Sequence, residues 1–237
     1  MKQNRKVTIL STFAKDKIID RKRKIVTIKK GGPAFYLSNV FKKEKILFNF
    51  ITSSIAEIEI LITKNGEIGK VKEKPKIQKI DFSKIKTDYL VISTILNDFN
   101  LSGVSFFKGK IFLDIQGYVR DSRRLGGKKF FSPPEEIISS VFCLKGTKEE
   151  LKYIPKIWLN QQKQKILIIT KGKLGCEVFI FGKKFQLRPK KKIIAPNTVG
   201  AGDVFFAYTI SKFLKTNEIL KSIEYALKRT SEFLLSK

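Results

Sequence analysis

Runs of apolar residues alternate with amphipathic segments along this chain of 237 residues. Near-continuous apolar runs are typical of strands that are buried on both faces of a parallel sheet. Such runs occupy residues 6–13, 88–94, 109–115, 140–145 and 164–170. Because helical patterns lie between them, the sequence predicts an α/β fold, with a doubly wound, mostly parallel sheet flanked by helices.

Four segments have the spacing of helices. Residues 33–43 begin with a proline, which is favourable at the first helical position. Residues 147–158 begin with Thr147, and Glu150 follows at the spacing of a capping box. The segments 203–215 and 218–236 predict two further helices near the C-terminus.

Two other segments predict strands outside the plain βαβ series. Residues 23–29 form a β-type run before the first helix, and residues 57–71 alternate around Asn65-Gly66, which is typical of a type I′ hairpin. We expect a small β-layer near residues 21–30 and 57–72, where a kinase-like enzyme would have a lid over its substrate. An edge hairpin of the main sheet is the alternative.

The organisation of the chain is simple. It has no internal repeat, low-complexity tract or linker, so we predict that residues 1–237 form a single domain. No apolar run approaches the roughly 18 uncharged residues that a membrane-spanning helix needs. The apolar stretch near the N-terminus is too short for a signal sequence. We therefore expect a cytoplasmic protein, either a monomer or a homodimer.

Positive charge dominates the composition. The chain has 49 Lys and Arg against 21 Asp and Glu, a formal net charge of +28, and the basic residues are densest in residues 21–30 and 183–192. Such a surface can attract phosphate groups or nucleic acid. The lysines are nevertheless spread along nearly every segment, and no aromatic-interleaved RNA-binding pattern is present. We therefore interpret the positive charge as a feature of the overall composition and not of a binding site, and we expect no specific nucleic-acid partner.

The residue types that are missing limit the chemistry. There is no histidine, which excludes Ser-His-Asp triads and histidine-ligated metals. Two cysteines, Cys143 and Cys176, are too few for a disulfide framework or a structural zinc site. A catalytic base must therefore be a carboxylate, lysine, tyrosine or cysteine.

The most informative stretch is Asn-Thr-Val-Gly-Ala-Gly-Asp, residues 197–203. Its small residues immediately precede a predicted helix, where exposed N–H groups and the helix dipole bind anions. Asp203 lies in the first turn, where it could simply be a helix cap. A carboxylate beside an anion hole also suits phosphoryl transfer, because the carboxylate can deprotonate an attacking hydroxyl.

This stretch resembles the D-T-x-G-A-G-D signature of the ribokinase/PfkB carbohydrate and nucleoside kinases, and other segments match in the right order. Gly31-Gly32-Pro-Ala-Phe-Tyr resembles the double-glycine motif of the inositol-kinase-like branch, and residues 114–120 resemble its D-x-Q-G-x-x-R stretch. Residues 145–150 take the place of the N-x-x-E motif, and residues 170–175 resemble the T-x-G-x-x-G turn. The resemblance covers nearly the whole chain and implies a shortened, ribokinase-like fold.

The resemblance implies a role for each matching residue. Catalysis would rest on Asp203 as general base, with an anion hole formed by Gly200, Ala201 and Gly202. The phosphate acceptor would be bound by Asp16, Gly31, Gly32 and Arg120. The nucleotide would be bound by Thr170, Gly172, Gly175, Asn197 and Thr198. Glu150 would help to organise Mg²⁺ through water.

The sequence therefore predicts an ATP-dependent kinase that phosphorylates a hydroxyl of a small sugar or polyol. The cofactors would be ATP and Mg²⁺, and an inositol-like acceptor is the best guess. A nucleoside kinase is one alternative. The other is a degenerate kinase fold that binds nucleotide or a polyanion without turnover, because Asn197 replaces the first acid of the signature and Thr147 replaces the Asn of N-x-x-E.

Overall fold

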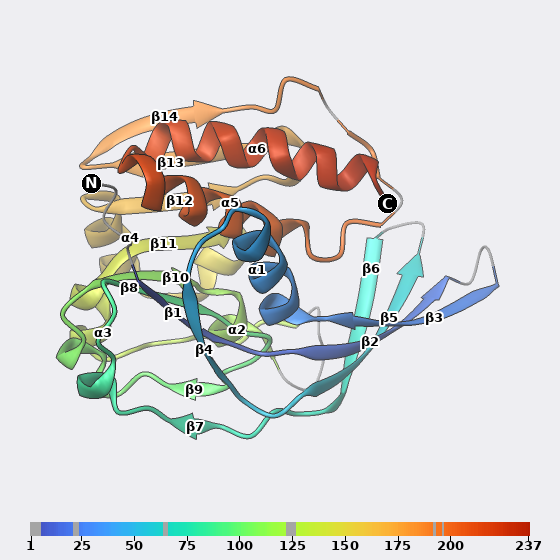
Figure 1. The fold of residues 1–237 in the computed structure, drawn as a ribbon, viewed down its shortest axis with the longest axis horizontal. Coiled ribbons are helices and arrows are strands. Elements are labelled where there is room, and N and C mark those ends of the chain that lie inside the picture. The colour runs from blue at the N-terminus through green and yellow to red at the C-terminus, as the bar shows by residue number, and fades with distance from the viewer. Residues whose placement is uncertain (1–5, 21–23, 64–65, 122–126, 192, 196) are drawn as a thin grey trace.

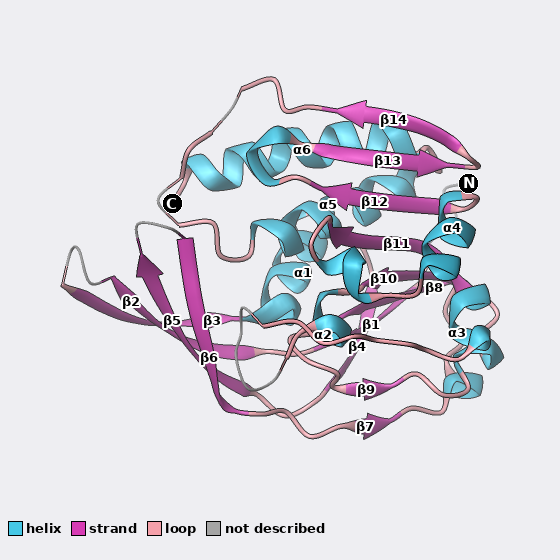
Figure 2. Ribbon diagram, turned by 180° about the vertical axis from the view of Figure 1, so that it is seen from behind, coloured by secondary structure: helices cyan, strands magenta, loops and turns pink. Residues whose placement is uncertain are grey.

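The computed structural model describes residues 6–20, 24–63, 66–121, 127–191, 193–195 and 197–237. Within these residues the chain forms a large sheet with helices on both faces and a smaller sheet that extends from one end of it (Figures 1 and 2). No helix in the described part of the chain is long and apolar enough to cross a membrane.

The large sheet has eight strands among the described residues, and six of them are parallel. The last two strands pair antiparallel at one edge. In spatial order the strands are β14 (Lys183–Leu187), β13 (Cys176–Ile180), β12 (Ile166–Thr170), β11 (Val141–Thr147), β10 (Lys110–Asp114), β8 (Tyr89–Ser93), β1 (Val7–Ser11) and β4 (Phe48–Thr52). This order confirms the predicted mostly parallel sheet.

Helices cover both faces of this sheet. One face carries α1 (Gly32–Lys43), α5 (Ala201–Thr216) and α6 (Ile219–Leu235), as Figure 1 shows. The other face carries α2 (Gln116–Val119), α3 (Glu135–Ser140) and α4 (Lys156–Lys163), together with short 3₁₀ turns. Those turns are η1 (Phe82–Lys84), η2 (Val104–Phe106) and η3 (Glu150–Tyr153), and a further turn, η4 (Gly172–Leu174), follows β12.

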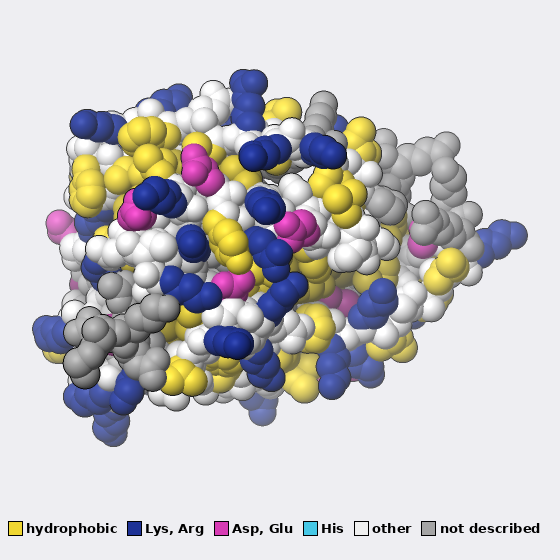
Figure 3. All heavy atoms as spheres, turned by 45° about the horizontal axis from the view of Figure 1, so that its top comes forward, with side chains coloured by type: hydrophobic (Ala, Val, Ile, Leu, Met, Phe, Trp, Pro, Cys, Tyr) yellow, Lys and Arg dark blue, Asp and Glu magenta, His cyan; other side chains and the backbone are white. Residues whose placement is uncertain are grey.

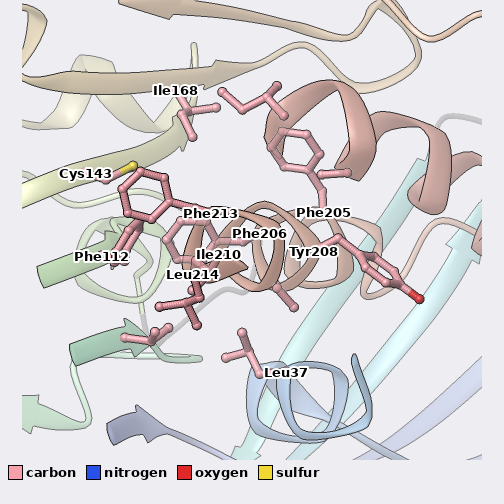
Figure 4. Packing of buried hydrophobic residues seen from close by; sticks show 14 of the residues in the cluster. Leu37, Phe112, Cys143, Ile168, Phe205, Phe206, Tyr208, Ile210, Phe213 and Leu214 are labelled. Atoms are coloured by element: carbon pink, nitrogen blue, oxygen red, sulfur yellow. The ribbon is translucent and has the colours of Figure 1, made fainter. Parts of the chain in front are cut away.

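Alternate residues of the central strands enter two separate cores. On β8, Val91 packs under the α1–α5–α6 layer, whereas Leu90 and Ile92 pack under the opposite layer. Figure 4 shows the first core, where Phe112 from β10 faces Phe213 from α5. Burial on both faces explains why the central strands are continuous apolar runs in the sequence.

The smaller sheet contains both predicted extra strands. Its order is β3 (Ile25–Gly31), β2 (Ala14–Asp20), β5 (Ala56–Thr63) and β6 (Gly66–Glu73). β5 and β6 pair antiparallel as the hairpin pattern predicts, although Asn65 of its turn lies outside the described residues. A two-stranded sheet of β7 (Gln78–Lys79) and β9 (Phe99–Asn100) completes the fold.

The predicted helix over residues 147–158 is wrong. Thr147 is the last residue of β11, where it pairs with Thr170, and α4 begins only after Pro155. The capping box itself is present: the Thr147 N–H donates to Glu150 Oε2 at 2.8 Å, and the Glu150 N–H donates to Thr147 Oγ1 at 3.1 Å. It opens the 3₁₀ turn η3, because Pro155 cannot lie inside a continuous helix.

Candidate active site

A cavity of about 290 Å³ lies where the two sheets meet, close to the carboxyl ends of the parallel strands. Open α/β sheets bind their ligands at this end. Residues from several distant segments line the cavity, among them Asp16, Gly32, Tyr36, Arg120, Gly200 and Asp203. The structure thus brings together most of the residues that the sequence predicts for catalysis and acceptor binding, but Gly31 and Ala201 do not line the cavity.

The N-terminus of α5 opens into this cavity. Gly200 is its N-cap, with a left-handed φ of 80°, and no side chain caps the helix. Gly200 and Gly202 both line the cavity, so the uncapped first turn presents backbone N–H groups there. Ala201 does not line it, and its N–H donates to the Thr198 carbonyl at 2.9 Å.

The left-handed turn at Gly200 is also a close approach between two helices. A Cβ at this position would fall 2.2 Å from a ring carbon of Tyr36 on α1. Glycine is therefore required at this position both by the left-handed φ and by the close packing against Tyr36. The aromatic ring of Tyr36 fixes the position of the α5 N-terminus relative to α1.

Asp203 lies in the first turn of α5 and lines the cavity. Burial raises the pKa of its carboxyl to about 7, although nearby Lys145 opposes the shift. The pKa of a general base is most effective near the working pH. The N-cap residue of this helix is Gly200, so Asp203 is not the N-cap itself but the acidic residue of the first turn.

Asp16 approaches the cavity from the smaller sheet. It lies on β2, is only 3% exposed, and its Oδ1 has no hydrogen-bond partner among the described residues. Burial raises the pKa of its carboxyl to about 6. A buried acceptor without a partner is costly unless a ligand supplies a donor. A ligand hydroxyl in the cavity can fill that role.

The two glycines of the double-glycine motif make room at this position. A Cβ at Gly31 would lie 1.8 Å from Asp16 Oδ2, and one at Gly32 would lie 2.6 Å from the Thr12 carbonyl oxygen. Gly32 also has a φ of 80°, which favours glycine. The motif therefore lets β3 pass against Asp16 and turn directly into α1.

Arg120 follows α2 and reaches the same cavity. Its Nη1 donates to the Ile95 carbonyl at 3.0 Å, while its Nε has no partner in the described structure. Burial lowers the pKa of the guanidinium, and the surrounding carboxylates, Glu150 and Asp203 first, oppose the shift. A guanidinium stays protonated in proteins, so Arg120 places a positive charge beside the cavity.

The residues expected at the nucleotide are less closely grouped. Thr198 lines the cavity, whereas Thr170, Gly172, Gly175 and Asn197 do not. Thr170 ends β12, Gly172 begins the short turn η4 with a φ of 56°, and Gly175 follows that turn with a φ of 92°.

Two of these residues have clear local roles in the structure. A Cβ at Gly175 would fall 2.1 Å from the Leu187 carbonyl oxygen. Glycine therefore allows the backbone before β13 to lie against the end of β14. Asn197 Oδ1 accepts a hydrogen bond from the Val199 N–H at 2.9 Å, which shapes the loop before α5.

Glu150 is 4% exposed and does not line the cavity. One of its oxygens belongs to the capping box with Thr147, and the other lies 4.0 Å from Lys128 Nζ. Among the described residues no cluster of three or more acidic or cysteine side chains could hold a metal ion. The expected role of Glu150 in organising Mg²⁺ through water therefore stays a prediction.

The structure adds two charged residues that the sequence did not single out for the site. Asp114 ends β10, Lys145 lies opposite it on β11, and their side chains form an ion pair of 2.6 Å. Both are almost completely buried. Charged residues at the ends of two otherwise apolar strands were the available signal.

The comparisons with known proteins agree with this geometry. Residues 120–232 match the model of the "pfkB family carbohydrate kinase". A search of curated proteins found no significant match. The similar solved structures share 12–16% sequence identity with the chain, so they define its fold.

Three of these structures cover almost the whole chain. A pyrophosphate-dependent kinase of the ribokinase family, complexed with a pyrophosphate analog and myo-inositol, has a TM-score of 0.75 at 16% identity and covers 97% of this chain and 95% of its own. Arabidopsis thaliana ribokinase, complexed with ribose and ATP, has a TM-score of 0.70 at 14% identity, with 97% and 92% covered. Methanocaldococcus jannaschii nucleoside kinase has a TM-score of 0.72 at 16% identity, with 100% and 93% covered.

The fold is thus that of the ribokinase-family kinases. Residues 120–232 are similar to the pfkB family carbohydrate kinases, and the fold of almost the whole chain is similar to that of ribokinase-family kinases.

Proposed function

We propose that this protein transfers the γ-phosphoryl group of ATP to a hydroxyl of a small sugar or polyol, with an inositol-like molecule as the best acceptor. One observation carries the proposal. Asp16, Arg120, the α5 N-terminus and Asp203 surround one cavity, so acceptor-binding and proton-accepting groups lie together. The solved neighbour that is complexed with myo-inositol supports a polyol acceptor.

The chemistry follows from the positions of these groups. The acceptor binds with its hydroxyls donating to Asp16, whose Oδ1 lacks another partner in the described structure. The reacting hydroxyl gives its proton to Asp203 as its oxygen attacks the phosphorus. The bond between that phosphorus and the bridging oxygen breaks, and ADP leaves.

Charge on the transferring phosphoryl is stabilised by the N-terminus of α5. Gly200 and Gly202 bring the backbone of the uncapped turn to the cavity, and the helix dipole adds to their effect. Arg120 adds a positive charge beside the same space. A bound Mg²⁺ would neutralise phosphate charge, and Glu150 would orient its water ligands.

Two alternatives keep specific support. A nucleoside acceptor is favoured by the likeness to the archaeal nucleoside kinase, and pyrophosphate as donor is favoured by the likeness to the pyrophosphate-dependent kinase. A degenerate fold that only binds its ligands is less well supported. A binding protein has no evident need for a carboxylate at Asp203 whose pKa is about 7.

The test is a turnover assay in which the acceptor and the donor are both varied. The acceptors are myo-inositol, ribose, fructose and adenosine, and the donors are ATP and pyrophosphate, each with Mg²⁺. We expect ATP with a polyol to give the highest kcat/KM. If kcat/KM is highest with adenosine, the acceptor is a nucleoside and not a polyol. If it is highest with pyrophosphate, the donor is pyrophosphate and not ATP. No turnover with any pair, while ATP still binds, would favour the degenerate fold.

A further inference from the structure

The ion pair between Lys145 and Asp114 lies directly behind the anion-binding turn. The side chain of Lys145 is 4% exposed and that of Asp114 is 1% exposed, and Nζ lies 2.6 Å from Oδ2. A Cβ built on Gly202 would lie 3.3 Å from Lys145 Nζ. The ammonium group therefore lies close to the first turn of α5, although Lys145 itself does not line the cavity.

Two side chains lie around this ammonium group. Asp114 is its cross-strand partner between β10 and β11, and the ring of Phe206 on α5 lies 5.8 Å away. Neither Lys145 nor Asp114 lines the cavity, so the pair has no direct access to a substrate there. Any effect on the reaction must pass through the first turn of α5.

Such a pair is not needed for stability alone. A buried ion pair is often no more stabilising than apolar residues of the same volume, because both charges lose their hydration. Burial would lower the pKa of Lys145, but Asp114, Asp203 and Glu150 outweigh this and raise it. The lysine therefore remains charged beneath the turn that carries Asp203.

On this basis we propose, given the kinase function above, that Lys145 is a positioning residue for phosphoryl transfer. Held by Asp114, it keeps a permanent positive charge against the first turn of α5, and that charge favours the ionised, proton-accepting form of Asp203.

The charged groups around Asp203 determine which variants must be compared. Burial raises the pKa of Asp203, Lys145 from β11 lowers it, Asp114 from β10 raises it, Arg120 lowers it and Asp16 from β2 raises it. Among these charged groups, Lys145 has the largest effect on the pKa of Asp203 and Asp114 has the next largest. Loss of Lys145 alone should therefore raise the pKa of Asp203 most, and loss of both should raise it less. Loss of Asp114 alone should lower it.

Four proteins provide the test: wild type, Lys145→Met, Asp114→Asn and the double variant. The readout is the titration of the Asp203 carboxyl carbon by NMR, assigned by comparison with Asp203→Asn. We expect the midpoint to increase from Asp114→Asn through wild type and the double variant to Lys145→Met. The increase from wild type to Lys145→Met should be at least one pH unit, about a tenfold change in proton affinity.

The matched control is Lys152→Met, which removes the same charge from a lysine that is 57% exposed and paired with Glu149. It should leave the Asp203 midpoint unchanged. The double variant buries no unpaired charge, so it keeps the test possible if Lys145→Met does not fold. A purely structural pair predicts the wild-type midpoint in every variant that folds, and that result would overturn the proposal.

The titration does not depend on turnover, which separates the two proposals. If no donor and acceptor pair reacts but the midpoints follow the expected order, the charge arrangement stands and the kinase function fails. If the wild type turns over but the midpoints coincide, the role of Lys145 is wrong and the kinase function remains. In an active enzyme, the acidic limb of the kcat profile should move in the same order as the midpoints.

Discussion

The carboxylate of Asp16 lies so close to Gly31 on the neighbouring strand that a Cβ there would fall 1.8 Å from Oδ2. Gly31 has extended backbone angles, so its side chain is excluded by Asp16 rather than by backbone strain. The glycine thus keeps open the position of the carboxylate that we propose to bind the acceptor.

The substitution Gly31→Ala should therefore displace the Asp16 side chain. We expect the KM for the acceptor to increase about tenfold or more, because one well-placed hydrogen bond to a charged group contributes roughly 1.5–3 kcal/mol. The KM for ATP should change by less than twofold, which makes it an internal control. Steady-state kinetics with each substrate varied in turn provide the measurement, and an equal increase of both KM values would argue against the assigned role.

Asp203→Asn removes the proton acceptor while it keeps the size of the side chain. If Asp203 is the general base, kcat should decrease by roughly 10² to 10⁴ while the KM for ATP stays nearly constant. A kcat within about threefold of the wild-type value would contradict the assignment. Binding of ATP measured by calorimetry shows whether the site remains intact in the variant.

The stability of the same variant provides its folding control, with a definite sign. Because the pKa of Asp203 is raised from 3.8 to about 7 by burial, the folded state holds its proton more tightly than the unfolded state. The stability from this group is complete below about pH 4 and is lost as the pH rises through 7. Asp203→Asn should therefore melt higher than wild type at pH 8, by roughly 2–8 °C for about 1–2 kcal/mol, and the difference should vanish near pH 4.

The pH dependence of the wild-type reaction follows from the same two carboxylates. Turnover should increase with pH and level off above about 7, where Asp203 is ionised. Affinity for the acceptor should weaken below about pH 6, where Asp16 becomes protonated. Separate pH profiles of kcat and of the acceptor KM check both expectations. A kcat that stays constant between pH 5.5 and 8.5 would exclude Asp203 as the titrating base.

Gly200→Ala should damage the anion-binding turn in two ways. Its φ of 80° is strained for alanine, and the new Cβ would fall 2.2 Å from the Tyr36 ring. We expect kcat to decrease by about tenfold or more and the melting temperature to decrease. Adding Tyr36→Ala removes the clash but not the backbone strain, so it should restore stability in part and kcat less. Full recovery of both in the double variant would show that packing alone mattered.

The basic surface gives a prediction about nucleic acid. Figure 3 shows Lys and Arg side chains scattered over the visible face among acidic and apolar ones, and the formal net charge is +28. We expect binding to duplex DNA to be weak, with a Kd of roughly 10⁻⁴ to 10⁻⁶ M, and to be lost at moderate salt. Fluorescence anisotropy across a salt series measures it. Sub-micromolar binding at physiological salt would indicate a specific nucleic-acid site.

The central strands could be predicted because burial on both faces makes them continuous apolar runs. β2 could not, since Asp16 occupies a buried position where alternation calls for an apolar residue. β14 was hidden for the opposite reason: Lys183 and Lys184 are exposed at the start of this strand, which pairs with β13 alone in the sheet.

The site shows the same division. The glycines before Asp203 could be recognised because a local pattern defines the start of an anion-binding helix. The contact between Lys145 and Asp114 depends on the register of two strands that are 31 residues apart along the chain. No local pattern fixes that register. Similarly, the capping box at Thr147 was visible, but the pairing of Thr147 with Thr170 at the end of β11 was not.

The division of the site between two sheets has a consequence for engineering. On the proposed function, Asp16 and Gly31 belong to the smaller sheet, while Asp203 and its anion-binding turn belong to the layer on the larger one. The groups proposed for acceptor binding and for phosphoryl chemistry thus lie in different parts of the fold that meet at the cavity. Exchanging β2, β3, β5 and β6 for those of another ribokinase-type kinase is therefore a route to new acceptors that leaves the donor chemistry in place.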